Sequence, residues 1–209
     1  MKNLILSAGG DIHETTIVDW FWVSLLPKNP KVLYIPIAWE NGNYEDCLRW
    51  FSGLMTKYGI GDYAMWTELA DKIFDDLDAF DSVYIGGGNT FKLLHVFRES
   101  GFIDLLRRYI RTGKPVFGGS AGAIILGANI GLAALGENSD VNDVGISDLS
   151  GLDEVDGYAV QCHYAPDQDD EIADWCAAKA FSAVSLAEAS GIYVTDEGIS
   201  SIGSEARFF

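Results

Sequence analysis

Ser120 is the residue of this sequence best placed for nucleophilic chemistry. It stands in the glycine-rich segment 118–122, between the apolar runs 114–117 and 123–126. This pattern predicts a buried strand that turns sharply into a helix, with one hydroxyl at the corner. Glycines beside the serine let the neighbouring backbone pass without a Cβ clash, and the first amides of the helix point toward any oxyanion formed there. We therefore predict a nucleophile elbow at Ser120.

A serine hydroxyl is a weak nucleophile and needs a base within hydrogen-bond reach. The sequence has three histidines, His13, His95 and His163. His163 directly follows a predicted strand, at the sheet edge where ligands gather in parallel α/β folds. His13 lies near the start of a predicted helix and His95 lies within one, so we expect structural roles for both. His163 is the predicted general base.

The base must itself be held by a carboxylate that selects its tautomer. The acidic, glycine-containing segment between the serine and the histidine offers several carboxylates, and its weak pattern predicts a long excursion over the surface. The residue pattern does not choose among these candidates, which are Glu137, Asp140, Asp143, Asp148, Asp153, Glu154 and Asp156.

A second glycine-rich turn, 86–88, follows the predicted strand 81–85 and precedes an amphipathic stretch. Unhindered backbone amides in this turn can approach an oxyanion together with the amide of Ala121. The turn, Ser120 and His163 are all expected at one edge of the sheet, which is the main argument for a catalytic site there.

The predicted elements alternate along the chain. Strands are predicted at 4–6, 32–36, 62–66 (an edge strand), 81–85, 114–117, 158–162, 192–194 and 199–202, the last two as a terminal pair. Helices are predicted at 12–26, 44–58, 70–80, 91–97, 103–111 and 169–186. Alternation of this kind predicts one α/β domain spanning residues 1–209, with a three-layer, doubly wound, mostly parallel sheet.

Composition argues against several classes of protein. The formal charge is −17, from 31 acidic and 14 basic side chains, and such a field repels nucleic acid. No apolar stretch approaches the ~20 residues of a membrane span, and the N-terminus is predicted to be a first strand rather than a signal peptide. Three cysteines without metal-ligand spacing indicate reduced thiols. We expect a soluble, cytoplasmic protein that uses no metal or organic cofactor.

With these motifs in order, the chain resembles the peptidase E family of serine peptidases (family S51), which includes aspartyl dipeptidase and, more distantly, cyanophycinase. The matching segments are 86–91, 119–123 and 162–164. Their order and the overall length agree, so the resemblance covers essentially the whole chain. It implies a fold related to class I glutamine amidotransferases, which is flavodoxin-like, with serine at the elbow in place of cysteine.

The resemblance also implies catalytic roles. Ser120 is expected to be the nucleophile and His163 the general base, and the amides of Gly88 and Ala121 are expected to form the oxyanion hole. For the acid, residues 142–144 look like the aspartate segment of the dipeptidases and favour Asp143, whereas residues 136–137 look like the glutamate segment of cyanophycinase and make Glu137 the alternative.

Gly87, Asn89 and Thr90 flank Gly88 in the matching motif, and we expect them to bind substrate. One departure concerns specificity. The dipeptidases carry an arginine after the histidine that pairs with the substrate aspartyl group, but segment 165–174 has none. A basic residue would have to come from elsewhere, such as Lys92 or Arg98. The acidic segment could instead receive a substrate amine or basic side chain, or simply begin a solvated helix, where carboxylates suit the helix dipole.

The leading functional hypothesis is a serine peptidase that acts on small peptides through an acyl-enzyme, as a monomer or homodimer, with no nucleic-acid or membrane partner. An α/β-hydrolase-like esterase is a second hypothesis because it shares the elbow and the chain order serine, acid, histidine. The short chain and the lack of an upstream His-Gly dipeptide weigh against the esterase. A catalytically silent binding protein with an amidotransferase-like fold is a third.

Overall fold

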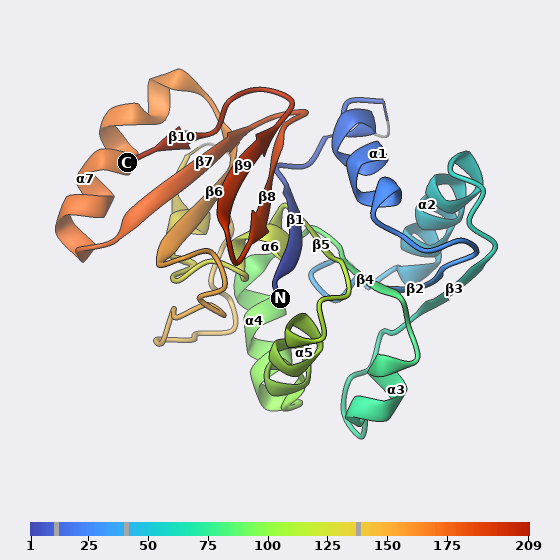
Figure 1. Ribbon diagram of the computed structural model, residues 1–209. Helices are drawn as coiled ribbons and strands as arrows, with labels where there is room; N and C mark the ends of the chain where they lie inside the picture. Colours follow the sequence, from blue (N-terminus) through green and yellow to red (C-terminus); the bar gives the residue numbers. More distant parts are fainter. Residues whose placement is uncertain (11–12, 40–41, 137–138) are drawn as a thin grey trace.

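A large, mostly parallel sheet organises the computed structural model, which describes residues 1–10, 13–39, 42–136 and 139–209 (Figure 1). Its strand order is β3-β2-β4-β5-β1-β8-β9. The strands are β1 (Asn3–Ser7), β2 (Lys31–Ile35), β3 (Asp62–Met65), β4 (Ser82–Ile85), β5 (Val116–Gly119), β8 (Gly191–Thr195) and β9 (Gly198–Ile202). The first five strands pair in parallel, and the terminal pair β8–β9 adds antiparallel to β1. The predicted edge strand β3 and the predicted terminal pair are confirmed.

Helices cover both faces of this sheet. The helices are α1 (Thr16–Ser24), α2 (Tyr44–Lys57), α3 (Phe74–Asp78), α4 (Thr90–Glu99), α5 (Phe102–Arg111) and the single turn α6 (Ala121–Ile124). Successive strand side chains point to opposite faces, so Ile5 packs with Trp22 of α1 and Phe51 of α2, while its neighbours Leu4 and Leu6 pack on the other face. Figure 1 shows α1 and α2 on one side of the sheet and α4 and α5 on the other. The three-layer α/β prediction is confirmed.

A second, smaller sheet carries β6 (Tyr158–Tyr164), β7 (Ser182–Ala187) and β10 (Arg207–Phe208), in the order β10-β7-β6. Helix α7 (Asp169–Lys179) packs against it through Ile172 and Cys176. The predicted helix 169–186 was therefore wrong in its second half. Ala180 adopts a left-handed conformation (φ 56°) that ends α7, and the chain continues as β7 parallel to β6. This correction matters for the site, because β7 and β6 end side by side.

The acidic excursion between α6 and β6 is mostly irregular, as predicted. It contains the 3-10 turn η1 (Gly131–Ala134) and the bridge between Asn129 and Ser150, and a second 3-10 turn, η2 (Pro166–Gln168), precedes α7. Over the residues that the structure describes, every helix is too short or too polar to cross a membrane.

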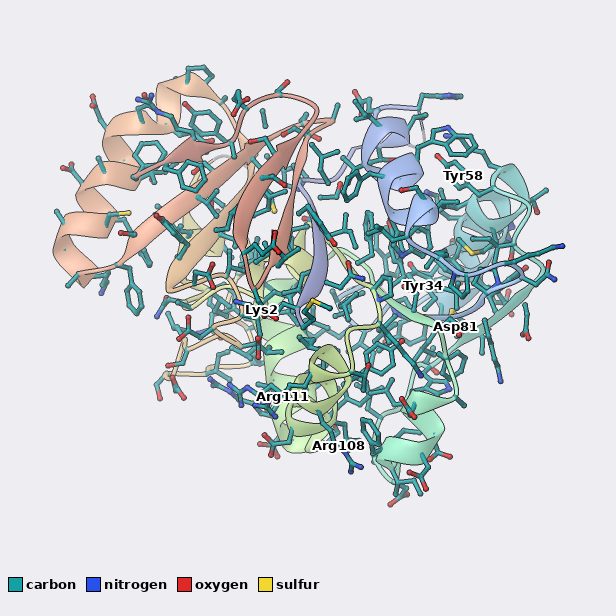
Figure 2. The ribbon with its side chains drawn as sticks, viewed as in Figure 1. Lys2, Tyr34, Tyr58, Asp81, Arg108 and Arg111 are labelled. Carbon is teal, nitrogen blue, oxygen red and sulfur yellow. The ribbon has the colours of Figure 1, made fainter. Side chains whose placement is uncertain are left out.

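Asp19 is a buried carboxyl group on α1, and it lies close to the C-terminal end of α2. Its Oδ2 accepts hydrogen bonds from Thr15 Oγ1 (2.9 Å) and from Tyr58 Oη (3.4 Å), which is labelled beside α2 in Figure 2. Its Oδ1 is buried without a partner among the described residues. Burial outweighs these hydrogen bonds and raises the pKa of Asp19 to about 6.

Asp19→Asn should therefore become progressively more stable than wild type as the pH rises from about 4 to about 6. The folded wild type keeps a proton that the unfolded chain releases in this window, so ionisation of Asp19 costs folding free energy at neutral pH. A shift of about two pKa units corresponds to about 3 kcal/mol. Urea unfolding of both proteins at pH 4, 5, 6 and 7.5 would measure the difference. The exposed Asp62→Asn is the control, and a difference that does not change with pH would contradict the prediction.

Candidate active site

Ser120 stands at the turn between β5 and α6, as predicted. Its backbone has φ 50° and ψ −114°, a conformation that costs energy for any residue with a Cβ atom. The turn needs glycine beside it, because a Cβ atom on Gly122 would fall on the carbonyl oxygen of Ile85 in the neighbouring strand β4. The hydroxyl is thereby held at the carboxyl edge of the parallel strands.

His163 approaches this hydroxyl from the other sheet. Its φ is 56°, and the pairing of β6 with β7 is irregular between Gln161 and Tyr164, so the strand bulges at the histidine. The ring Nε2 lies 2.9 Å from Ser120 Oγ. Gly9, after β1, lies against the ring, since a Cβ atom there would be 2.9 Å from His163 Cε1. The predicted pairing of Ser120 with His163 is present as a hydrogen bond.

The carboxylate on the far side of the histidine is Glu188. Its Oε1 lies 2.6 Å from His163 Nδ1. A carboxylate can only accept, so Nδ1 carries the proton and Nε2 is left to accept from the serine hydroxyl. The expected acid, Asp143, is exposed in the excursion and lines no cavity beside Ser120. The alternative, Glu137, lies outside the described residues. Glu188 thus occupies the position beside His163 that was expected for Asp143. Unlike Asp143, it comes after the histidine in the chain.

Pairing of β6 with β7 explains the position of Glu188. The two strands run in parallel, and Tyr164 is in register with Ala187. The ends of the two strands therefore lie next to each other, which brings Glu188, directly after β7, to His163 near the end of β6, although the two residues are 25 positions apart. The segment 182–187 ahead of Glu188 was predicted as the end of a helix, and its local pattern does not by itself separate a strand from that helix. Treating that segment as a strand would have placed Glu188 at a strand end beside His163.

Gly88 and Ala121 are the residues whose backbone amides are expected to form the oxyanion hole. Gly88 has φ +130°, and a Cβ atom there would overlap the Ala38 carbonyl, so only glycine fits. The amides of Gly88 and Ala121 donate no hydrogen bond to any described residue. Gly88 and Ser120 line the same cavities. Ala121 is buried and lines neither cavity, so of the two residues only Gly88 is placed on a cavity wall.

The residues expected to bind substrate around Gly88 divide into two groups. Gly87 lines a cavity with Ser120. Asn89 and Thr90 are buried and line neither cavity beside Ser120. The Asn89 side chain accepts from Lys92 N (2.9 Å) at the start of α4 and donates to Val141 O (2.8 Å). Asn89 and Thr90 thus shape the local fold rather than the cavity walls, because their position at a helix start turns them inward.

Two cavities meet at Ser120, and both include Gly88 and His163 in their linings. One has a volume of about 500 Å³; its lining includes several glycines, the carboxylate Asp46 and four aromatic side chains, Tyr34, Trp39, Trp50 and Tyr84. Figure 2 labels Tyr34 on the α2 side of the sheet. The other has a volume of about 670 Å³, lies toward α7, and includes four carboxylates, Asp140, Asp167, Glu171 and Glu188. A substrate bound at the serine can thus occupy a space with aromatic side chains in its wall and a more acidic space.

The thiol nearest to the serine is buried. Cys162 Sγ lies 3.8 Å from Ser7 O and 3.7 Å from Ser120 O. Burial strongly raises the pKa of this thiol, so it stays neutral and is a poor nucleophile. The cysteines Cys47, Cys162 and Cys176 are all free and buried. Across the described ranges, no three His, Cys, Asp or Glu side chains form a group that could hold a metal ion.

The known proteins to which this chain is similar are peptidases. The family model of Peptidase family S51 matches residues 4–202. Peptidase E of Haemophilus influenzae is 27% identical over 135 residues, which are 62% of this chain and 61% of that protein. An uncharacterized peptidase of Pasteurella multocida is 36% identical over 105 residues, 50% of each chain. The matched regions thus span about three fifths or less of these curated relatives.

Two solved structures share the fold over nearly the whole chain. A protein of Listeria monocytogenes EGD-e assigned to peptidase E superposes with a TM-score of 0.75 at 21% identity, covering 98% of this chain and 100% of that one. A peptidase from an acI-B1 Actinobacterium superposes with a TM-score of 0.71 at 15% identity, covering 100% of this chain and 94% of that one. The mixed α/β fold is common to all three chains.

Proposed function

This chain belongs to Peptidase family S51, and from that premise we propose that it is a serine peptidase that hydrolyses small peptides through an acyl-enzyme. Membership of the family supports peptidase activity. The observation that carries the serine mechanism is the continuous hydrogen-bonded chain from Ser120 through His163 to Glu188, with separations of 2.9 and 2.6 Å, at the meeting point of two cavities.

In the first step, Ser120 Oγ attacks the carbonyl carbon of the peptide bond while His163 Nε2 takes the hydroxyl proton. The carbonyl oxygen becomes an oxyanion, which the amides of Gly88 and Ala121 stabilise by donating hydrogen bonds. Glu188 keeps the ring in the required tautomer and balances the charge of the imidazolium that forms. Its side chain is 52% exposed, so water shares in this stabilisation.

In the second step, the C–N bond breaks and His163 returns the proton to the leaving amine, which leaves an ester on Ser120. Water then enters, loses a proton to His163 and attacks the ester, and the proton goes back to Ser120 as the carboxylic acid departs. Each step uses only the residues already at the site and one water molecule.

A fluorophosphonate probe tests this proposal on the wild-type protein. We expect covalent labelling at Ser120, located by peptide mass spectrometry, and loss of dipeptide hydrolysis in proportion to the fraction labelled. The substrates are a small dipeptide panel, blocked and unblocked at the amino end, beside simple aryl esters. Turnover of aryl esters alone would favour the esterase, and absence of labelling would favour the silent binding protein. Full labelling with unchanged dipeptide hydrolysis would overturn the serine mechanism.

A further inference from the structure

The smaller of the two cavities at Ser120, the aromatic cavity, has two partly exposed tryptophans in its wall. Trp39 lies beside the Gly88 turn and Trp50 lies on α2, and the two residues are 40% and 39% exposed. Tryptophan is usually well buried, because its ring is large and mostly apolar. Two such rings in water beside the candidate nucleophile present apolar surface that a ligand can cover. Because Ser120 and His163 line the same cavity, that ligand would be part of the substrate.

Trp50 packs against an aromatic base formed by two tyrosines of the large sheet. Its ring centroid lies 6.1 Å from that of Tyr34 and 6.0 Å from that of Tyr84. The two tyrosines are in register on β2 and β4 and are nearly buried. Tyr34 stacks on Phe51 (4.2 Å), and Tyr84 stacks on Phe117 (4.3 Å). This wall is therefore supported by packed rings before a ligand binds, which lowers the cost of ordering it on binding.

Glycines keep the space between this base and the candidate nucleophile free of side chains. Gly86 and Gly87 directly follow β4, and both line the aromatic cavity. A Cβ atom on Gly86 would lie 3.1 Å from Tyr34 Cε2, and a Cβ atom on Gly87 would lie 3.1 Å from Ser120 Cβ. The cavity volume of about 500 Å³ lies within the range of about 300–1,000 Å³ that is typical of small-molecule sites. The aromatic cavity therefore has room for one large side chain.

Apart from the candidate general base, the described lining of the aromatic cavity carries little free charge. Asp46 is the carboxylate among its described residues, and its two oxygens accept from Arg49 Nη1 (2.6 Å) and from Asn43 Nδ2. Burial raises the pKa of the Cys47 thiol and of the Tyr34 hydroxyl, so both groups are neutral at pH 7. A charged ligand group would lose water in such a cavity without gaining a free partner, whereas an apolar group would gain by leaving water.

The basic residues expected to reach a substrate carboxylate lie outside this lining. The 14 lysines and arginines are all in the described part of the chain, and none of them lines either cavity at the candidate nucleophile. Lys92 Nζ donates to Trp39 O (2.6 Å). Arg98 donates to Asp148 O and Ser150 O (both 2.6 Å). The aromatic cavity is therefore a poor site for an aspartyl or glutamyl side chain.

We propose that the aromatic cavity binds a large apolar side chain of the substrate, on one side of the bond that Ser120 attacks. The inference rests on the proposed peptidase function, because it takes a peptide as the ligand. A phenylalanine, tryptophan or leucine side chain would pack against Trp39 and Trp50 and remove their exposed surface from water. A methyl group is too small to reach both rings, so alanine at the same position should be disfavoured.

Binding to the Ser120→Ala protein tests the cavity without requiring catalysis. Calorimetric titrations would compare Phe-Ala and Ala-Phe with Ala-Ala, and would include Glu-Ala and Ala-Glu as charged peptides. Phenylalanine at one of the two positions should make binding about tenfold tighter or more, as expected for burial of a large apolar side chain. Glutamate at that position should give no gain over alanine. The position at which phenylalanine acts identifies the side of the bond that faces the cavity.

Substitutions of tryptophan locate this preference on the molecule. In the Ser120→Ala background, Trp50→Ala should reduce the preference for phenylalanine to about twofold, and Trp50→Phe should restore most of it. Trp39→Ala should act in the same direction as Trp50→Ala. The matched control is Trp20→Ala, which removes a more exposed tryptophan (58%) from α1, outside the cavity, and should leave the preference unchanged. Circular dichroism would confirm that each variant is folded.

Equal binding of phenylalanine and alanine peptides at both positions would overturn the inference, as would a preference for glutamate or the absence of measurable peptide binding. A phenylalanine preference that survives both Trp50→Ala and Trp39→Ala would also overturn it. These outcomes are separate from those of the fluorophosphonate experiment. If Ser120 fails to react but the preference is present, the peptidase proposal falls and the apolar site stands as part of a peptide-binding site. If Ser120 reacts and the protein hydrolyses phenylalanine and alanine peptides equally, the peptidase proposal stands and the apolar site falls.

Discussion

Ser120→Ala is expected to lower kcat/KM for peptide hydrolysis by about 10⁴-fold or more, because it removes the oxygen that forms the acyl-enzyme. The fold should be unaffected, since the strained backbone at position 120 is equally accessible to alanine and the Ser120 backbone amide still donates to Ser7 O (3.0 Å). Steady-state kinetics on the best dipeptide of the panel, with a thermal melt of both proteins, would measure the two effects.

The matched control for Ser120→Ala is Cys162→Ala, which removes the buried thiol next to the serine backbone. Because this thiol is neutral and shielded, the variant should keep activity within about tenfold of wild type. Strong loss in Cys162→Ala together with retained activity in Ser120→Ala would exclude Ser120 as the nucleophile.

Glu188→Gln is expected to lower kcat by about 10²- to 10³-fold with little change in KM. Glutamine has nearly the same shape, but it carries no charge to balance the imidazolium and can hold the ring in the wrong tautomer. The effect should be smaller than for a fully buried carboxylate, because half of the Glu188 side chain faces water. The rate of fluorophosphonate labelling should fall in parallel, since labelling also requires an activated serine.

Asp143→Asn and Glu137→Gln are the matched comparisons for Glu188→Gln. Both remove one carboxylate from the segment between the serine and the histidine. We expect both variants to keep activity within about twofold of wild type, because Glu188 already occupies the position beside His163 Nδ1. Asp143 is also exposed and lines neither cavity at Ser120. A large loss of kcat in either variant, together with near wild-type kcat in Glu188→Gln, would show that the catalytic acid is Asp143 or Glu137 and not Glu188.

Local sequence was sufficient for the elements whose signals are short and strong. The turn at Ser120 requires glycines for close packing, and it was predicted correctly. Helix α2 and the strand pair β8–β9 were also predicted correctly, because their apolar residues follow the spacing of a helix and of short strands. The pairing of Ser120 with His163 was also anticipated, but on the assumption that both residues lie at one edge of a single sheet; β6 in fact belongs to the second sheet, and the packing of the two sheets brings His163 to the serine.

The partner of His163 on its other side depended on tertiary structure. The run 182–187 has no local signal strong enough to separate a strand from the continuation of α7, and the choice is made by its pairing with β6. That pairing also decided the identity of the carboxylate, since it brings Glu188 to His163 Nδ1 and leaves Asp143 on the surface. Likewise, Asn89 and Thr90 were expected to contact substrate, but they lie at the start of α4 and their side chains are buried.

Sequence motifs therefore specified which residue types stand at the ends of strands, because the backbone at a tight turn restricts residue choice locally. The tertiary fold decided which strand ends meet, because strand pairing is set by long-range packing and hydrogen bonding. That pairing and packing determined which carboxylate lies beside His163 and which side chains line the two cavities. They also left the acidic cavity without a basic side chain in its lining.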